Sequence, residues 1–354
     1  MNDYQSLAAT IGEHSRNRRP LRIIGGGSKR FCAEDGESGD KISTAALTGI
    51  VEYEASELYL SARAGTPLTE INTALKKQRQ MMAFEPPQFG GGTLGGAVAS
   101  GLSGPGRIRH GALRDHILGV TLINGNGELL KFGGRVIKNV AGYDISRLCA
   151  GAWGTLGLIV EATIKVHPLP AAEITRSLEL SPTAALTFIN AQLRQGMPVS
   201  AGFYDGKRLH LRVSSTADDL SWAEKTLGGD VGDNALWATV RDHQHPFFTR
   251  PKAEVSLWRL SVPATADCAL VGESVFEWHG ALHWLQSDKP AAEIRKAVSK
   301  IGGQAWRFKA AAECNDNAAV FHPLPEVLTN LHRRLKRAFD PAGILNSGVM
   351  FSDL

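Results

Sequence analysis

Apolar and polar positions in the first half of the chain alternate in the way that short strands and one amphipathic helix produce. Residues 58–62 are predicted to be a strand, and residues 69–78 a helix. Residues 117–133 alternate as a β-hairpin whose turn, Asn124-Gly125-Asn126-Gly127, is a strong hairpin signal. Residues 158–166 form an apolar run that predicts a buried strand. Together these elements predict an α+β domain.

After Pro168 and Pro170 the pattern changes to short strands that alternate with amphipathic helices. The sequence predicts helices over 182–194, 217–227, 291–301 and 325–339, and strands over 174–180, 200–214, 254–262, 280–286 and 305–309. This order is typical of an antiparallel sheet with helices on one face. We therefore expect a first domain over 1–170, a second domain over 171–324, and a C-terminal helix and tail over 325–354.

Glycine gathers in three clusters, at 25–29, 90–101 and 151–157. The first cluster follows an apolar segment that ends at Ile24, which predicts a strand followed by a tight turn. Because glycine has no Cβ and accepts positive φ, backbone N–H groups can approach a ligand closely at such turns. Arg30 stands where a G-x-G-x-x-G motif requires glycine, and no Gly-Lys-Ser/Thr ends a P-loop. The clusters therefore predict a pyrophosphate held by backbone amides, without the usual dinucleotide or P-loop motif.

Composition and charge limit the classes of protein to which the chain can belong. It has 354 residues, of which 43% are hydrophobic and 21% are charged, as in an ordinary globular protein of two domains. The formal net charge is only +4, and the basic run Arg16, Arg18 and Arg19 has no interleaved aromatic residues that could stack on bases. We expect no nucleic acid partner.

Neither a membrane span nor a metal centre is predicted. No stretch approaches the ~20 apolar residues that a transmembrane helix needs, so we expect a cytosolic protein or one that is peripheral to a membrane. Cys32, Cys149, Cys268 and Cys314 are far apart and form no C-x-x-C pair. Such cysteines predict buried thiols in a reducing compartment, with no iron–sulfur cluster or zinc in this chain.

At this point the motifs resemble those of a known family. The resemblance rests on the loop 25–28 and the segments Thr93–Gly96, Gly111–Asp115, Lys138–Asp144, Gly154–Gly157 with Pro168, and Asp340–Asn346. In this order they are similar to the FAD-binding PCMH-type flavoproteins related to vanillyl-alcohol oxidase and D-lactate dehydrogenase. Within that family, the chain is most similar to the FAD-binding subunits of bacterial glycolate oxidases. The resemblance implies an FAD domain of two α/β subdomains and a cap domain built on an antiparallel sheet with helices.

The resemblance also implies which residues bind FAD. The N–H groups of the loop 25–28 and of residues near Thr93 would surround the pyrophosphate, and Asn346 would approach the flavin from the tail. The full implied set is Gly25, Gly26, Gly27, Ser28, Thr93, Leu94, Gly95, Gly96, Gly101, Gly111, Asp115, Gly154, Thr155, Gly157, Ile159, Val160 and Asn346. For Ile159 and Val160, a place in the core of a strand is an equal alternative. The loop 25–29 contains no histidine, which predicts noncovalent FAD. Valine at Gly26 or Gly95 should then remove FAD and leave the fold intact.

The second domain departs from the pattern of relatives that oxidise 2-hydroxy acids. Those relatives carry an H-A-G-D-G-N-L-H strand motif and a later E-H-G-x-G, which supply metal ligands and a base. Here the first motif is shortened to His279-Gly280-Ala281-Leu282-His283, and Glu313-Cys314-Asn315-Asp316 stands near the place of the second. Two histidines four apart in a strand would face the same side and could bind a metal, although a packed or surface pair is the more ordinary interpretation. Catalytic residues stay unassigned.

Three functions remain open from the sequence. By resemblance, the chain is an FAD-binding subunit that works with a catalytic flavin subunit and an iron–sulfur subunit to pass electrons from glycolate or D-lactate to an acceptor. Alternatively it is a self-sufficient FAD oxidase or dehydrogenase whose base is His243, His245, His279 or His283. The third possibility is a structural subunit that kept the fold and lost the flavin.

Overall fold

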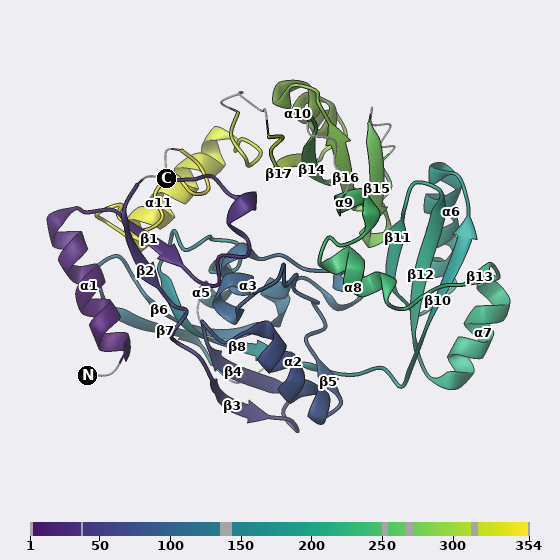
Figure 1. Ribbon diagram of the computed structural model, residues 1–354, viewed down its shortest axis with the longest axis horizontal. Coiled ribbons are helices and arrows are strands. Elements are labelled where there is room, and N and C mark those ends of the chain that lie inside the picture. The colour runs from purple at the N-terminus through teal and green to yellow at the C-terminus, as the bar shows by residue number, and fades with distance from the viewer. Residues whose placement is uncertain are drawn as a thin grey trace. The chain divides into compact units, whose positions relative to one another are not determined.

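The computed structural model describes residues 3–36, 38–134, 144–249, 254–266, 272–312 and 318–352 (Figure 1). The chain forms two compact units: the first contains 1–102, 112–168 and 323–354, and the second contains 103–111 and 169–322. The chain passes from the first unit to the second after residue 168 and returns after residue 322. Each position lies two residues before the expected boundary, after 170 and after 324. The sequence did not predict that 103–111 leaves the first unit. Those residues join the second unit because α4 (Arg107–His110) packs against β11 (Val199–Tyr204).

A five-stranded antiparallel sheet is the centre of the first unit. Its strand order is β3 (Ile50–Glu54), β4 (Tyr59–Arg63), β8 (Leu158–Lys165), β6 (Ile117–Ile123) and β7 (Leu129–Gly133). The predicted hairpin is confirmed, since β6 pairs with β7 from Gly119↔Gly133 to Ile123↔Leu129. The helices α2 (Leu68–Lys77) and α3 (Leu94–Ser100) contribute apolar side chains to the same core as β4, β6 and β8.

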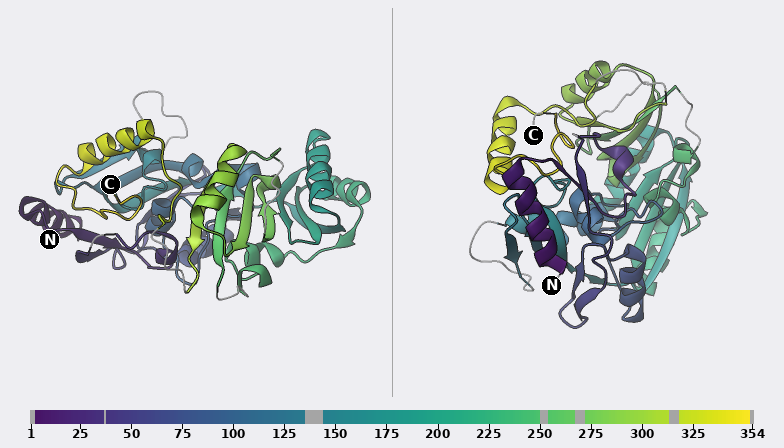
Figure 2. Two further views of the ribbon diagram at one scale, coloured as in Figure 1. Left: turned by 90° about the horizontal axis from the view of Figure 1, so that it is seen from above. Right: turned by 60° about the vertical axis from the view of Figure 1, so that its left-hand side comes forward.

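A smaller layer of the first unit joins the two ends of the chain. Strand β1 (Leu21–Ile24) pairs in parallel with β2 (Asp40–Ser43), and α1 (Asp3–Asn17) shares their core through Ile11. The tail that follows α11 (Glu326–Phe339) extends this layer: the Leu21 N–H donates to the Ile344 carbonyl at 2.7 Å, and the Asn346 N–H donates to the Leu21 carbonyl at 3.0 Å. The terminal helices, purple and yellow in Figure 2, therefore belong to one unit.

The second unit is built on an eight-stranded antiparallel sheet, as the sequence predicted. Its order is β13 (Asp230–Val231), β10 (Ala172–Glu179), β12 (Arg208–Ser215), β11, β15 (Glu273–Glu277), β16 (Leu282–Ser287), β14 (Ser256–Ser261) and β17 (Gln304–Lys309). The helices α6 (Pro182–Arg194) and α7 (Ala217–Leu227) begin where predicted, because the hydroxyls of Ser181 and Thr216 accept bonds from the first-turn N–H groups. With α10 (Ala291–Lys300), they share apolar cores with the sheet.

Helices lie on both faces of this sheet, so the expectation of a single helical face was wrong. Beyond the three long helices, α8 (Leu236–Arg241) and α9 (Pro246–Thr249) form a short segment that the sequence did not predict. Phe248 of α9 packs edge to face against Trp284 of β16, whose neighbour Leu285 packs in the α10 core on the opposite side. The sequence pattern was interpreted as one buried face of the sheet, but all six residues of β16 are buried, so both faces of this strand are covered.

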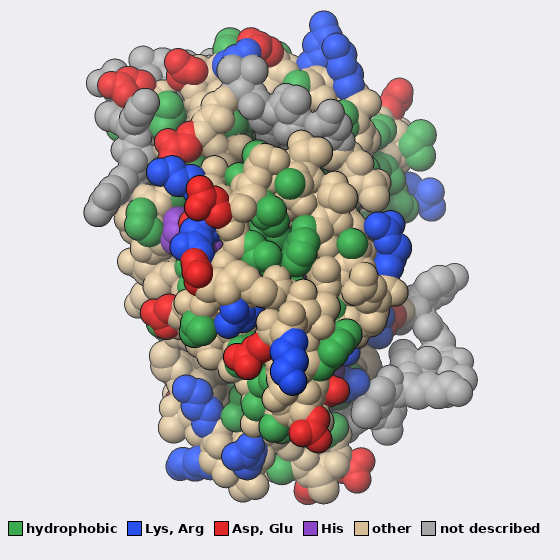
Figure 3. All heavy atoms as spheres, turned by 90° about the vertical axis from the view of Figure 1, so that its right-hand side faces the viewer, with side chains coloured by type: hydrophobic (Ala, Val, Ile, Leu, Met, Phe, Trp, Pro, Cys, Tyr) green, Lys and Arg blue, Asp and Glu red, His purple; other side chains and the backbone are tan. Residues whose placement is uncertain are grey.

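Two observations bear on whether the chain binds nucleic acid and whether it crosses a membrane. On the face of the second unit seen in Figure 3, blue basic and red acidic side chains intermingle and do not gather into a basic stripe. Among the helices that the structure describes, none is long and apolar enough to cross a membrane.

Candidate functional site

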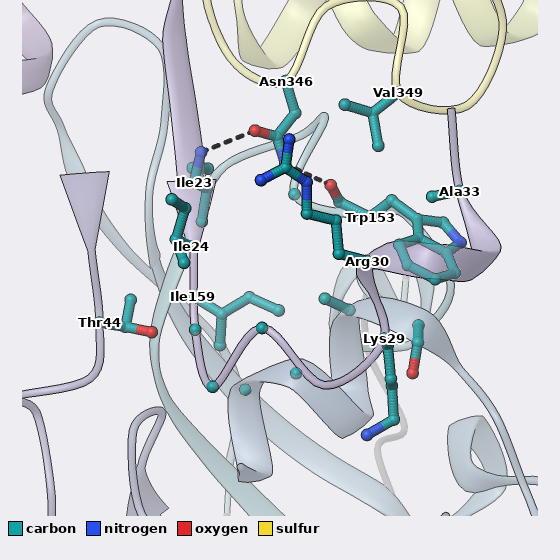
Figure 4. Close-up of a pocket in the computed structure, with 18 of the residues that line it drawn as sticks. Ile23, Ile24, Lys29, Arg30, Ala33, Thr44, Trp153, Ile159, Asn346 and Val349 are labelled. Carbon is teal, nitrogen blue, oxygen red and sulfur yellow. Dashed lines mark hydrogen bonds between the residues drawn. The ribbon is translucent and has the colours of Figure 1, made fainter. Parts of the chain in front are cut away.

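The three glycine clusters meet around one pocket of the first unit (Figure 4). Its volume is about 410 Å³, within the range of roughly 300–1,000 Å³ that is usual for ligand sites. Of the residues expected to bind a cofactor, eleven line it: Gly25, Gly26, Gly27, Ser28, Thr93, Gly95, Gly96, Gly154, Gly157, Ile159 and Asn346.

The other six expected residues do not line this pocket: Leu94, Gly101, Gly111, Asp115, Thr155 and Val160. Leu94 and Val160 are fully buried core residues, and Val160 follows Ile159 on the opposite face of β8. Gly101 ends α3 with a φ of 65°, and Gly111 belongs to the second unit. Asp115 accepts a bond from the N–H three residues before it, and the Thr155 hydroxyl donates to the carbonyl three residues before it. The side chains of Asp115 and Thr155 therefore bond to backbone groups three residues away within the fold.

The loop after β1 presents unused hydrogen-bond donors to the pocket. Within the described part of the chain, none of the N–H groups from Gly25 to Ser28 donates to a protein acceptor. The chain turns at Gly27, where φ is 72°, and a Cβ placed there would meet no atom within 4 Å. Successive open N–H groups in such a turn form a concave anion site. The loop therefore fits a cofactor pyrophosphate.

The first N–H groups of α3 are already occupied. Leu94 N–H donates to the Thr66 carbonyl at 3.0 Å, and Gly95 N–H donates to the Ala64 carbonyl at 2.8 Å. Gly96 N–H donates to the Thr93 hydroxyl at 3.3 Å, which is the N-cap bond of this helix. In this structure Leu94, Gly95 and Gly96 therefore offer no open N–H group, and the open donors of the pocket belong to the loop 25–28.

Two of the glycines are required by the packing of the protein itself. A Cβ on Gly26 would lie 2.3 Å from the Gly91 carbonyl oxygen, and one on Gly95 would lie 2.7 Å from the Ala64 Cβ. Real Cβ atoms do not approach backbone so closely, so either substitution forces the backbone to move. Loss of FAD from a valine variant at Gly26 or Gly95 would therefore not by itself show that the amide faces the cofactor, because the backbone must shift as well.

Asn346 joins two sides of the pocket. Its Oδ1 accepts a bond from the Ile23 N–H at 2.7 Å, and its Nδ2 donates to the Trp153 carbonyl at 2.6 Å, as the dashed lines in Figure 4 show. Its backbone φ is 44°, in the left-handed region. One residue of the tail thus ties β1 to the loop that carries Gly154.

A buried ion pair holds the tail that carries Asn346. Lys336 and Asp340 are 7% and 1% exposed, and their Nζ and Oδ2 atoms are 2.7 Å apart. The Lys336 Nζ also donates to the carbonyls of Thr155 at 2.9 Å and Leu345 at 2.5 Å, while the Leu345 N–H donates to Asp340 Oδ2 at 2.7 Å. Lys336 therefore fixes the end of α11 to both the tail and the glycine loop 151–157.

Basic side chains border the pocket and complement phosphate groups. Arg22, Lys29 and Arg30 line it together with one acid, Glu34. Lys29 is 6% exposed, and its Nζ lies 5.6 Å from the centre of the Phe89 ring. The sequence reasoning missed these basic residues and Trp153. A signal was available for Lys29, since it follows directly after the glycine loop.

His279 and His283 do not form a pair on one strand face. His279 lies in the 3₁₀ turn η3 (Trp278–Gly280) with a φ of 57°, and only His283 belongs to β16. Burial lowers the pKa of each to about 4. The Nε2 of His283 bonds to the Gly280 carbonyl at 3.0 Å, whereas the buried Nε2 of His279 has no partner among the described residues. The assumption that both lie in a strand was wrong, because three successive positive φ values at 278–280 interrupt it.

The other two candidate bases are embedded among aromatic rings. The ring of His243 stacks on Phe248 at 4.1 Å between centroids and lies edge-on to Trp284 at 4.6 Å. Desolvation lowers its pKa to about 3. His245 packs edge to face with Phe203 at 5.0 Å, and desolvation lowers its pKa as well. All four histidines belong to the second unit, outside the pocket lining.

Several expected features fall outside the described residues or have no ligand geometry. The segment Glu313–Asp316 lies outside them, as do Cys268, Cys314 and all of Lys138–Asp144 except Asp144. Cys32 and Cys149 are buried free thiols, and burial raises the pKa of Cys149 to about 12. Across the described ranges, no three His, Cys, Asp or Glu side chains gather in a geometry that could hold a metal ion.

The open N–H groups and basic side chains around the pocket are suited to a cofactor that carries phosphate groups, and comparisons with known proteins identify the cofactor of the family. Residues 1–133 match the family model described as an FAD binding domain. The chain is 38% identical over 355 aligned positions to the glycolate oxidase subunit GlcE of Escherichia coli (strain K12), with 99% of each chain covered. It therefore belongs to the family of FAD-binding oxidoreductase subunits that includes GlcE, and FAD is its cofactor.

More distant comparisons agree with this family. The mitochondrial D-lactate dehydrogenase [cytochrome] 1 of Saccharomyces cerevisiae is 28% identical over 182 residues, which are 51% of this chain and 31% of that protein. A solved structure of alkyldihydroxyacetonephosphate synthase matches with a TM-score of 0.68 at 15% identity, covering 97% of this chain and 75% of that one. The second match shows the fold alone. The resemblance to PCMH-type flavoproteins and the predicted α+β fold are confirmed.

Proposed function

We propose that this chain is the FAD-binding subunit of a glycolate oxidase complex, in which it takes part in the transfer of electrons from a 2-hydroxy acid to an acceptor. The observation that carries the proposal is the 38% identity to the E. coli subunit over 99% of both chains. A match of this extent includes both units, whereas the match to the yeast dehydrogenase covers about half of the chain.

FAD would be held by the loop 25–28 and the basic residues beside it. The open N–H groups of that loop and the side chains of Arg22, Lys29 and Arg30 supply donors and positive charge for the pyrophosphate. Bound FAD supplies two-electron redox chemistry, and the protein orients it and controls its surroundings. We propose that FAD is noncovalent, since the loop contains no histidine and the thiol of Cys149 is buried and protonated.

The substrate would be oxidised with the help of a partner subunit. Oxidation of a 2-hydroxy acid releases two electrons and two protons, and a base beside the substrate contributes roughly 100-fold to 10,000-fold to the rate. His279 and His283 do not converge on one site, and His243 is enclosed by aromatic rings. We propose that a catalytic flavin subunit supplies the base, that an iron–sulfur subunit receives the electrons, and that any attachment to a membrane runs through these partners.

Reconstitution tests this proposal. The chain would be purified alone and together with the proposed catalytic flavin subunit of the same host, identified by its similarity to the glycolate oxidase subunit GlcD of Bacillus subtilis, to which this chain is 29% identical over 129 residues. The reduction of an artificial electron acceptor would be followed with glycolate and with D-lactate. We expect glycolate-dependent reduction only when both proteins are present. Equal activity of the partner without this chain, or full activity of this chain alone, would refute the assignment as a subunit.

A further inference from the structure

Among the described residues that line the cofactor pocket, Trp153 alone carries an aromatic ring. It belongs to the third glycine cluster, directly before Gly154, and its side chain is half-buried. In Figure 4 the indole lies at one side of the pocket, beside Ala33 and across the pocket from Ile23 and Ile24. The pocket therefore offers one flat aromatic surface to a ligand.

The backbone at Trp153 has a conformation that suits glycine better than tryptophan. Its φ is 51°, in the left-handed region, where a bulky side chain is strained. Glycine stands at two nearby positions with positive φ, Gly151 at 82° and Gly154 at 75°. The Trp153 N–H donates to the Ala99 carbonyl at 2.9 Å, and the Trp153 carbonyl accepts from Asn346, so both neighbours hold the strained residue in place. Strain that the surroundings maintain is typical of ligand sites.

The side of the pocket that carries Trp153 is closed by the protein itself. The Glu34 N–H donates to the Val349 carbonyl at 3.1 Å, and both residues line the pocket. A Cβ on Gly36 would lie 2.7 Å from the Val349 side chain, so the loop that carries Gly36 packs tightly against the tail. Asn346 joins the same tail to Trp153. A ligand ring beside Trp153 is therefore enclosed by a wall of the first unit.

FAD carries two aromatic ring systems, the adenine and the isoalloxazine, on opposite sides of its pyrophosphate. The isoalloxazine performs the redox chemistry and must stay within reach of a substrate or an electron acceptor, whereas the adenine serves binding alone. A closed wall therefore suits the adenine. Stacking on an aromatic side chain stabilises any base, because every base has a flat face.

From these observations we infer that the indole of Trp153 stacks on the adenine of bound FAD. The inference rests on the proposed place of the pyrophosphate at the loop 25–28, since only a ribose separates that group from the adenine. Trp153 adds an aromatic contact to a site otherwise built from backbone N–H groups and basic side chains. This contact accounts for a tryptophan where glycine would be relaxed.

Four variants of the full chain, each freed of FAD, test the inference. W153G removes the ring and relaxes the backbone, W153L keeps an apolar side chain without a ring, and W153F keeps a ring. W222A removes a 43% exposed tryptophan of the second unit and serves as the control. Each would be titrated by calorimetry with ADP, which contains the adenine and pyrophosphate of FAD, and with FMN, which contains its isoalloxazine. The melting temperature without ligand would be recorded alongside.

We expect W153G and W153L to bind ADP at least about fivefold more weakly than the wild-type chain, and W153F and W222A to stay within about threefold of it. FMN should bind alike to all five proteins. The melting temperature of W153G should not fall, since glycine adopts a φ of 51° without strain. If W153G does not fold, the comparison of W153L with W153F decides, because only W153F keeps a ring.

Wild-type affinity for ADP in W153L, or equal weakening in W153L and W153F, would overturn the stacking contact and leave the proposed function standing. Weakened binding of FMN in place of ADP would overturn the adenine in favour of the isoalloxazine. Failure of the wild-type chain to bind either ADP or FAD would overturn both the contact and the proposed cofactor site.

Discussion

Replacement of Lys336 by methionine removes the cation that neutralises Asp340. Methionine keeps most of the side-chain length, but Asp340 is 1% exposed and retains only the Leu345 N–H as a hydrogen-bond donor among the described residues. The carbonyls of Thr155 and Leu345 also lose a charged donor. Removing one member of a buried ion pair costs about 3–5 kcal/mol, because the remaining charge is uncompensated.

The expected result is a loss of about 3–5 kcal/mol in the free energy of unfolding of the first unit. At about 2–4 °C for each kcal/mol in a domain of this size, the melting temperature should fall by roughly 6–20 °C. Urea denaturation followed by circular dichroism measures the loss. FAD should also dissociate faster, because the released tail no longer holds Asn346 between Ile23 and Trp153.

Two further variants identify the cause. R337M removes a neighbouring exposed cation of the same helix and should change the free energy of unfolding by less than about 0.5 kcal/mol. K336M/D340N should recover part of the loss, since asparagine keeps the bond from the Leu345 N–H without a buried charge. If K336M is no less stable than R337M, the ion pair does not hold the tail and the reasoning fails.

Three other results follow from the structure. N346A loses both hydrogen bonds of the Asn346 side chain, each of which contributes about 1 kcal/mol. FAD binding should weaken roughly tenfold or more in a fluorescence titration. An unchanged affinity would place FAD elsewhere. G95A should lower the free energy of unfolding by about 1–3 kcal/mol, because its Cβ would meet Ala64. G91A, whose Cβ meets nothing within 4 Å, should be close to wild type. Equal stabilities would show that the contact is unimportant. The pKa of His279 is about 4 in the fold and 6.5 ordinarily. The unfolded chain therefore binds this proton first as the pH falls, and stability is lost from pH 6.5 downward, by about 2 kcal/mol at pH 5. Denaturation at pH 7 and pH 5 should show a smaller loss for H279Q than for wild type, and identical losses would contradict the assignment.

Local sequence signals located elements well where the ends of those elements are fixed by nearby residues. The predicted helices 182–194 and 217–227 match α6 and α7, because Ser181 and Thr216 are N-caps that act within three residues. The predicted strand 280–286 failed at its start. Residues 278–280 have positive φ values there. Trp278 is buried beside them, and its Nε1 donates to the carbonyl of Gly104, a residue 174 positions away. Such a contact leaves no periodic signal.

The glycine clusters predicted the place of the pocket but not the role of each glycine. A missing Cβ shows that something approaches closely, and sequence alone does not say whether this is a ligand or the protein. At Gly27 the space is open, whereas at Gly26 and Gly95 it is filled by Gly91 and Ala64. Lys336 was not predicted for a similar reason, since its acceptor Thr155 lies 181 residues away.

The central claim is that this chain binds FAD noncovalently in the pocket formed by the loop 25–28 and Asn346, and that it needs a partner to react with substrate. The most direct test is the visible absorption spectrum of the purified chain after incubation with FAD, recorded before and after anaerobic addition of glycolate. We predict a flavin band that survives gel filtration, is released by denaturation and stays oxidised with glycolate alone. A protein that remains colourless after incubation with FAD would contradict the account of the cofactor, and bleaching by glycolate alone would contradict its role as a dependent subunit.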